Sequence, residues 1–116
     1  MKLLIKNLPN KDLNKFWKMQ KEYLDNYTFS YVKKDYEKNK KLYVGAYDGK
    51  KLIGIAYGSP TIKNEVNLQG IAVILDNKYP RKGIGSKILK FFENQAKKLG
   101  KKKIGLGSAE GYVEKF

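Results

Sequence analysis

The feature that most constrains this chain is the segment from Tyr79 to Lys90, which reads Tyr-Pro-Arg-Lys-Gly-Ile-Gly-Ser-Lys-Ile-Leu-Lys. It is a basic, glycine-spaced loop that follows an apolar strand and leads into an amphipathic helix. Gly83 and Gly85 have no Cβ atoms, so successive backbone N–H groups can approach one anion at the positive end of the helix. Lys82 adds charge, and Arg81, the only arginine, offers a planar guanidinium that suits a pyrophosphate. The segment therefore predicts a phosphate-binding turn.

An ordinary strand-to-helix turn with one glycine at positive φ is the alternative interpretation of this segment. Two other phosphate-binding motifs are absent from the sequence. There is no Gly-x-x-x-x-Gly-Lys-Ser/Thr, and the glycines do not form Gly-x-Gly-x-x-Gly. Neither a nucleotide triphosphatase nor a dinucleotide-binding protein is supported.

The length of 116 residues predicts one domain, residues 1–116. The sequence contains neither cysteine nor histidine, which excludes disulfides, cysteine nucleophiles, histidine bases and the usual zinc sites. Any catalysis must use carboxylate, tyrosine, serine, lysine or backbone groups, and we expect no metal.

The formal net charge of +14 has two interpretations. Clustered lysines bind the phosphates of nucleic acids, whereas dispersed lysines such as Lys11, Lys15 and Lys18 only solvate the outer face of a helix. The second is favoured because acids are interleaved with the lysines, and a nucleic-acid partner stays open. No apolar run reaches the roughly 20 residues of a membrane span. We therefore expect a soluble, cytoplasmic protein without a membrane partner.

The first part of the chain predicts a short strand at 2–7 and a helix that begins at Asn10 as the N-cap. Apolar residues from Leu13 to Leu24 repeat at helical spacing, and a second helix is predicted at 29–38. Two β-rich runs, 41–47 and 51–57, flank Asp48-Gly49-Lys50 and predict a hairpin.

The second part predicts a buried strand at 65–75, in which Gly70 indicates a bulge or a close backbone approach. After the glycine loop, apolar residues from Ile84 to Leu99 repeat at helical spacing as far as Gly100, a typical C′ glycine. A strand follows at 103–106, and the polar segment from Ser108 begins to look helical at Tyr112.

This order of elements resembles the GNAT superfamily of acetyl-coenzyme-A-dependent N-acetyltransferases over essentially the whole chain. The family signature is Gln/Arg-x-x-Gly-x-Gly/Ala, and Gly83-Ile84-Gly85 matches its glycine half, while Pro80 stands at its first position. The resemblance implies an α+β (mixed α/β) fold with a central mixed, mostly antiparallel sheet and helices on both faces.

The resemblance also implies that a neutral amine attacks the thioester of acetyl-coenzyme A directly, with the acetyl carbonyl polarised by a strand N–H. The residues that would bind the coenzyme are Ile71, Ala72, Val73, Arg81, Lys82, Gly83, Ile84, Gly85 and Ser86. No catalytic residue is assigned, because Glu65 and Gln69 fit a strand-end charge and a solvent-facing amide better than a base. The identity of the amine acceptor is left open.

In many family members a tyrosine near the carboxyl end acts as the general acid, and two final strands follow. The segment Tyr112 to Phe116 stops before that tyrosine, and Tyr112 fits an ordinary aromatic better than a substitute. We therefore expect a carboxy-terminally short domain in which the strand Lys103–Leu106 is a bare edge. Bare edges recruit other strands, so either the natural chain continues or a homodimer forms through this edge with weak turnover.

Two other functions remain open at this point. One is a GNAT-like domain that binds a coenzyme A ester without transferring the acyl group. The other is a basic module that binds RNA or DNA, although an aromatic-and-basic motif typical of RNA recognition is missing.

Overall fold

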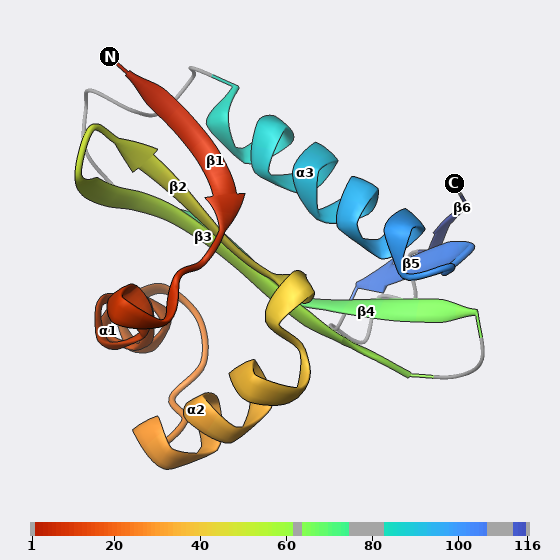
Figure 1. The fold of residues 1–116 in the computed structure, drawn as a ribbon, viewed down its shortest axis with the longest axis horizontal. Helices are drawn as coiled ribbons and strands as arrows, with labels where there is room; N and C mark the ends of the chain where they lie inside the picture. Colours follow the sequence, from red (N-terminus) through yellow and green to blue (C-terminus); the bar gives the residue numbers. More distant parts are fainter. Residues whose placement is uncertain (1, 62–63, 75–82, 107–112, 116) are drawn as a thin grey trace.

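The protein forms one six-stranded sheet in the computed structural model, which describes residues 2–61, 64–74, 83–106 and 113–115 (Figure 1). The strands follow one another across the sheet in chain order: β1 (Leu3–Asn7), β2 (Tyr43–Asp48), β3 (Lys51–Pro60), β4 (Glu65–Val73), β5 (Lys103–Leu106) and β6 (Val113–Lys115). Every neighbouring pair is antiparallel except β4 and β5, which are parallel. The predicted mixed, mostly antiparallel sheet is confirmed.

Helices cover both faces of the sheet, as predicted (Figure 1). They are α1 (Leu13–Tyr23) and α2 (Phe29–Lys38) on one face and α3 (Ile84–Lys98) on the other, with short 3₁₀ turns at Asn10–Asp12 and Lys40–Leu42. The apolar side of α3 packs on the strands through Ile88 and Phe92, both with no exposed surface. The apolar side of α1 packs through Phe16 on the rings of Tyr43 and Tyr57, with centroids 5.1 and 5.8 Å away.

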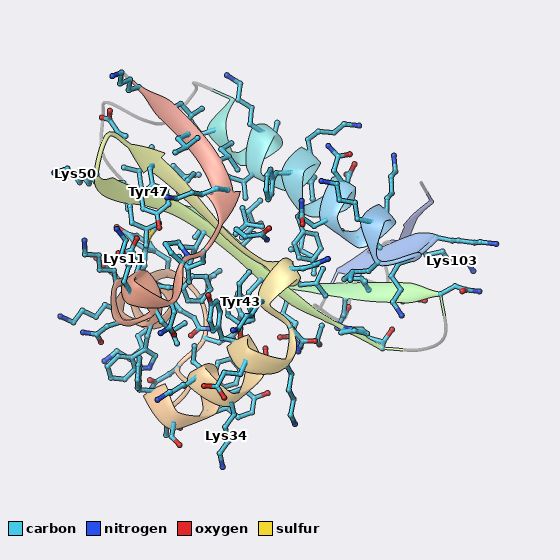
Figure 2. The ribbon with its side chains drawn as sticks, viewed as in Figure 1. Lys11, Lys34, Tyr43, Tyr47, Lys50 and Lys103 are labelled. Atoms are coloured by element: carbon cyan, nitrogen blue, oxygen red, sulfur yellow. The ribbon has the colours of Figure 1, made fainter. Side chains whose placement is uncertain are left out.

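Buried tyrosines join the sheet to the layer formed by α1 and α2. The hydroxyl of Tyr43 donates to Asp35 Oδ2 at 2.5 Å, and that of Tyr47 donates to Asp12 Oδ2 at 2.6 Å. Figure 2 labels both tyrosines where they lie between the strands and the helices. Each pair satisfies a hydroxyl that burial would otherwise leave without water.

The predicted N-cap Asn10 is wrong. Asn10 begins the 3₁₀ turn, and Asp12 occupies the position before α1 without a side-chain capping hydrogen bond. The Asp12 carboxylate instead accepts from the Tyr47 hydroxyl, 35 residues away. The Asp12 side chain thus hydrogen-bonds to the buried Tyr47 and does not cap the first N–H groups of α1.

Two expectations for the carboxyl end, a helical segment and a bare strand edge, are also wrong. Residues 113–115 form β6 rather than a helix, and they pair with the outer edge of β5 in the register Lys103↔Lys115 and Gly105↔Val113. The strand Lys103–Leu106 is therefore not the bare edge that we expected, and the reason given for a homodimer there no longer holds. Tyr112 lies outside the described residues.

Other expectations hold with small shifts. Strand β4 ends at Val73 rather than at residue 75, although Ile74 N still donates to Ile53 O at 2.9 Å. Gly100 has φ +78°, as a C′ glycine requires. Among the described residues, no helix is both long and apolar enough to cross a membrane.

Candidate functional site

The sheet opens between its two parallel strands. Strand β4 pairs with β3 along nearly its whole length, from Val66 to Val73, but it pairs with β5 only from Glu65 to Leu68. From Gln69 to Val73, no strand among the described residues pairs with the other edge of β4. On that edge its backbone N–H and C=O groups have no strand partner among the described residues, and a ligand with an extended amide chain can pair with such groups.

A β-bulge lies where the opening begins. Tyr57 pairs with Gly70 and Gly58 pairs with Leu68, so Gln69 is the extra residue of β4. Bulges bend a strand and change the direction of its backbone groups, and they are frequent next to active sites. The Gln69 side chain is held by a hydrogen bond from its Nε2 to Ser59 Oγ at 3.2 Å.

The three candidate residues of β4 alternate across the sheet. Ile71 and Val73 contact the core beneath α3, and Ala72 contacts the core beneath α1. Their side chains thus pack into the two hydrophobic cores. These residues can therefore contact a ligand in the opening through their backbone N–H and C=O groups.

The start of α3 has the geometry of an anion site. Gly83 precedes the helix with φ +69°, in the left-handed region that glycine tolerates best. The first helical hydrogen bond runs from Lys87 N to Gly83 O at 3.1 Å, so the N–H groups of Ile84, Gly85 and Ser86 have no acceptor within the helix. A Cβ added at Gly83 or at Gly85 would meet no atom within 4 Å. An anion can therefore approach these N–H groups closely.

The two parts of the candidate site meet at one end of the opening. Because β4 and β5 are parallel, the crossover through α3 must begin where β4 ends. Ile84 accordingly lies in the core cluster that Ile71 and Val73 also contact, and it is only 2% exposed. The candidate residues Arg81 and Lys82 lie outside the described residues.

The face of the sheet that α1 covers carries a pair that sequence reasoning missed. The hydroxyl of Tyr57, on β3, donates to Asp25 Oδ2 in the α1–α2 connection at 2.9 Å. Burial, reinforced by this carboxylate, raises the pKa of Tyr57. Gln20, on α1, lies near the same hydroxyl, and its side chain is only 1% exposed. Its Oε1 atom has no hydrogen-bond partner among the described residues. No local signal joins residues 32 positions apart.

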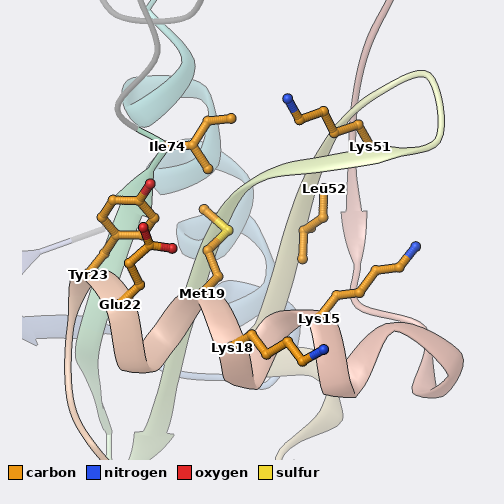
Figure 3. A pocket seen from close by; sticks show the side chains of 8 residues that line it. All are labelled: Lys15, Lys18, Met19, Glu22, Tyr23, Lys51, Leu52 and Ile74. Carbon is orange, nitrogen blue, oxygen red and sulfur yellow. The ribbon is translucent and has the colours of Figure 1, made fainter.

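A hollow of about 330 Å³ lies beside the end of β4, on the α1 face (Figure 3). The side chains of Met19, Leu52 and Ile74 converge on it, and lysines of α1 and β3 lie at its margin. Glu22 also lines the hollow, so its margin carries charges of both signs.

Solved structures of acetyltransferases share this fold. One is Ard1 from Thermoplasma volcanium, with 18% identity, a TM-score of 0.77 and coverage of 91% of this chain and 71% of that one. A GNAT family acetyltransferase from Brucella melitensis, in complex with acetyl-CoA, has 18% identity, a TM-score of 0.74 and coverage of 96% and 79%. PaiA N-acetyltransferase from Thermoplasma acidophilum, in complex with coenzyme A, has 23% identity, a TM-score of 0.62 and coverage of 91% and 79%.

The opened sheet and the glycine-started helix thus define a protein with the acetyltransferase fold. The sequence model of the acetyltransferase (GNAT) family matches residues 5–113, and the chain belongs to this family. No curated protein matches the chain.

Proposed function

We propose that this protein is an N-acetyltransferase that moves the acetyl group of acetyl-coenzyme A to an amine. The observation that carries the proposal is the opening of the sheet after Leu68, together with the N–H groups at the start of α3 that have no acceptor within the helix. The fold-sharing proteins from Brucella melitensis and Thermoplasma acidophilum, in complex with acetyl-CoA and coenzyme A, support a coenzyme of this type.

The coenzyme has two anchoring regions in this proposal. The pyrophosphate lies against the N–H groups from Gly83 to Ser86, with Arg81 and Lys82 adding charge. The pantetheine arm lies in the opening and pairs with the backbone of residues 71–73, as an added strand would. Backbone groups contribute to both anchors, and the side chains of Arg81 and Lys82 strengthen the one at the pyrophosphate.

The chemistry follows from this arrangement. The neutral amine attacks the thioester carbonyl carbon, a C–N bond forms, and a backbone N–H near the bulge at Gln69 stabilises the negative oxygen. The C–S bond then breaks, the amine nitrogen loses a proton to water, and the coenzyme leaves as a thiolate that takes up a proton. The acceptor enters on the side of Tyr57 and Asp25, where the carboxylate attracts a cationic amine before its deprotonation.

Isothermal titration with acetyl-coenzyme A tests the proposed site. The wild-type protein is expected to bind in the micromolar range, and Gly85→Glu is expected to abolish binding because a carboxylate would occupy the place of the anion. Asn94→Glu, which introduces the same charge at an exposed position nearer the other end of α3, is the matched control and is expected to bind as the wild type does. Unchanged affinity in a folded Gly85→Glu protein would contradict the site.

Release of free coenzyme A thiol with simple amines and peptides as acceptors tests the reaction itself. Turnover that requires both the acetyl donor and the amine is the expected result. Tight binding without turnover on any amine would contradict the transfer and support a domain that only binds coenzyme A esters.

A further inference from the structure

The solvent face of α3 carries four lysines and no exposed acid. Its exposed residues are Ser86, Lys87, Lys90, Asn94, Lys97 and Lys98. The one acid of this helix, Glu93, is only 9% exposed. Helices α1 and α2 differ, because Glu22 and Glu37 lie exposed among their lysines. The lysine-rich composition alone therefore does not explain why α3 exposes lysines without acids, because the other two helices of similar composition expose both.

The same charge continues beyond the helix. Lys102 and Lys103 are exposed directly after α3, and Figure 2 shows Lys103 extending away from β5. We call Lys87, Lys90, Lys97, Lys98, Lys102 and Lys103 the lysine track. At a rise of about 1.5 Å per residue, its helical part spans roughly 16 Å. Such a length suits several successive charges on a polymer rather than one small anion.

A pocket of about 490 Å³ lies at the end of the track. Its basic residues are Lys38, Lys40, Lys41 and Lys101, its apolar residues are Leu42, Pro60 and Leu99, and Glu37 and Asn39 complete it. Leu99, which follows the last helical residue of α3, is 39% exposed and contributes apolar surface to the pocket. Four lysines around an apolar floor offer both charge and a surface for a flat, partly apolar group.

We infer that the lysine track and this pocket bind single-stranded RNA, with backbone phosphates along the track and an unpaired base in the pocket. Phosphate contacts by lysine release counterions and supply most of the affinity of non-specific nucleic-acid binding. Unpaired bases that leave the strand and enter a protein pocket are typical of single-stranded RNA. A membrane surface fits less well, because membrane-bound helices expose apolar residues beside their lysines, whereas Ile88, Phe92 and Ala96 of α3 are buried against the sheet.

The inference is independent of acetyl transfer. The track begins after Ser86 and runs away from the proposed coenzyme site, and the pocket lies at the opposite end of α3. RNA binding and coenzyme binding can therefore succeed or fail separately in experiments.

Fluorescence anisotropy of a labelled single-stranded RNA of about 12 nucleotides, titrated with the full chain over a range of salt concentrations, tests the track. The track variant is Lys90→Gln with Lys98→Gln and Lys102→Gln. The control, Lys18→Gln with Lys33→Gln and Lys34→Gln, removes the same number of exposed charges from α1 and α2. Because each phosphate contact adds about 0.7 to the salt slope for single strands, the track variant should lose roughly 2 units of slope and roughly tenfold or more in affinity.

The control is expected to keep nearly the wild-type slope and affinity. Equal losses in the two variants would overturn the inference in favour of diffuse charge, as would absence of wild-type binding at physiological ionic strength, about 0.15 M. Circular dichroism spectra and thermal unfolding midpoints, measured in parallel, should stay unchanged in both variants and so show that they are folded.

A duplex of the same RNA tests the pocket, because paired bases cannot enter it. Weaker binding of the duplex, together with loss of single-strand affinity in Leu99→Asp, is the expected result. Equal or tighter binding of the duplex would overturn the assignment of a base to the pocket. Binding of phosphatidylserine vesicles through the track, without RNA binding, would replace RNA by a membrane surface and overturn the inference.

Discussion

The ring of Tyr57 lies directly against Gly70 on the neighbouring strand. A Cβ atom added to Gly70 would be 2.6 Å from Tyr57 Cε1 and 2.8 Å from Leu24 Cδ1, both closer than real Cβ contacts. Gly70 also follows the bulge at Gln69, at the start of the open edge of β4. The absent side chain thus lets the tyrosine, the α1–α2 connection and the proposed thioester region approach one another.

Gly70→Ala is expected to destabilise the protein by about 1–3 kcal/mol, as overpacking of a core does. The Tyr57 ring cannot move aside easily, because it is 1% exposed and held by Asp25. Urea unfolding measures the change, and Gly85→Ala, which has open space around it, is the control. Equal stability of the Gly70 variant and the wild type would contradict the close contact.

Gly83→Ala and Gly85→Ala should change stability in opposite directions. Gly83 has φ +69°, so alanine there costs about 1–2 kcal/mol of strain. Gly85 lies within α3 and is not among the glycines at positive φ, so alanine is expected to be neutral or to stabilise by up to about 1 kcal/mol. Thermal unfolding of the two variants in parallel decides this. The same direction of change in both would rule out the left-handed turn before α3.

Arg81→Ala is expected to weaken acetyl-coenzyme A binding more than Lys87→Ala. The Lys87 backbone makes the first hydrogen bond of α3, and its side chain is exposed on the helix. A charge-assisted contact from Arg81 contributes roughly 1.5–3 kcal/mol, which corresponds to about a tenfold to hundredfold loss in affinity. Titration calorimetry compares the two variants. Small, equal losses would mean that diffuse charge holds the coenzyme.

Alkaline pH should destabilise the protein through its buried tyrosines. Burial first, and then a neighbouring carboxylate, raises the pKa of Tyr43, Tyr47 and Tyr57. The folded state therefore holds these protons more tightly than the unfolded state, whose tyrosines titrate near about pH 10. Their contribution is complete below that pH and falls above it, by up to about 1.4 kcal/mol per pH unit for each tyrosine.

Urea unfolding between about pH 9 and pH 11 measures this effect. Tyr57→Phe should lower the slope of stability against pH in that range, and Tyr31→Phe is the control because Tyr31 is 51% exposed. A slope that is unchanged in Tyr57→Phe would show that this hydroxyl titrates equally in both states.

The sequence by itself determined the elements from β1 to β5 and the turn before α3. Helical periodicity predicted α2 at its observed bounds, the Asp48-Gly49-Lys50 segment predicted the hairpin, and Gly83 has the positive φ that the glycine loop allows. These signals are local, because periodicity and φ preference act within a few residues. The resemblance to a family then supplied the mixed, mostly antiparallel sheet with helices on both faces, which no local pattern contains.

Only the tertiary structure decided which groups meet. The Asp12 carboxylate accepts a hydrogen bond from Tyr47 and does not cap α1, and the Asp25 carboxylate accepts one from Tyr57. Residues 113–115 pair with β5. The opening after Leu68 likewise depends on how far two strands stay adjacent. In each case, partners that are distant in the chain compete for the same polar group. Burial determines which partner is chosen, because a buried polar group needs a hydrogen bond and takes it from whichever partner the packing brings within reach.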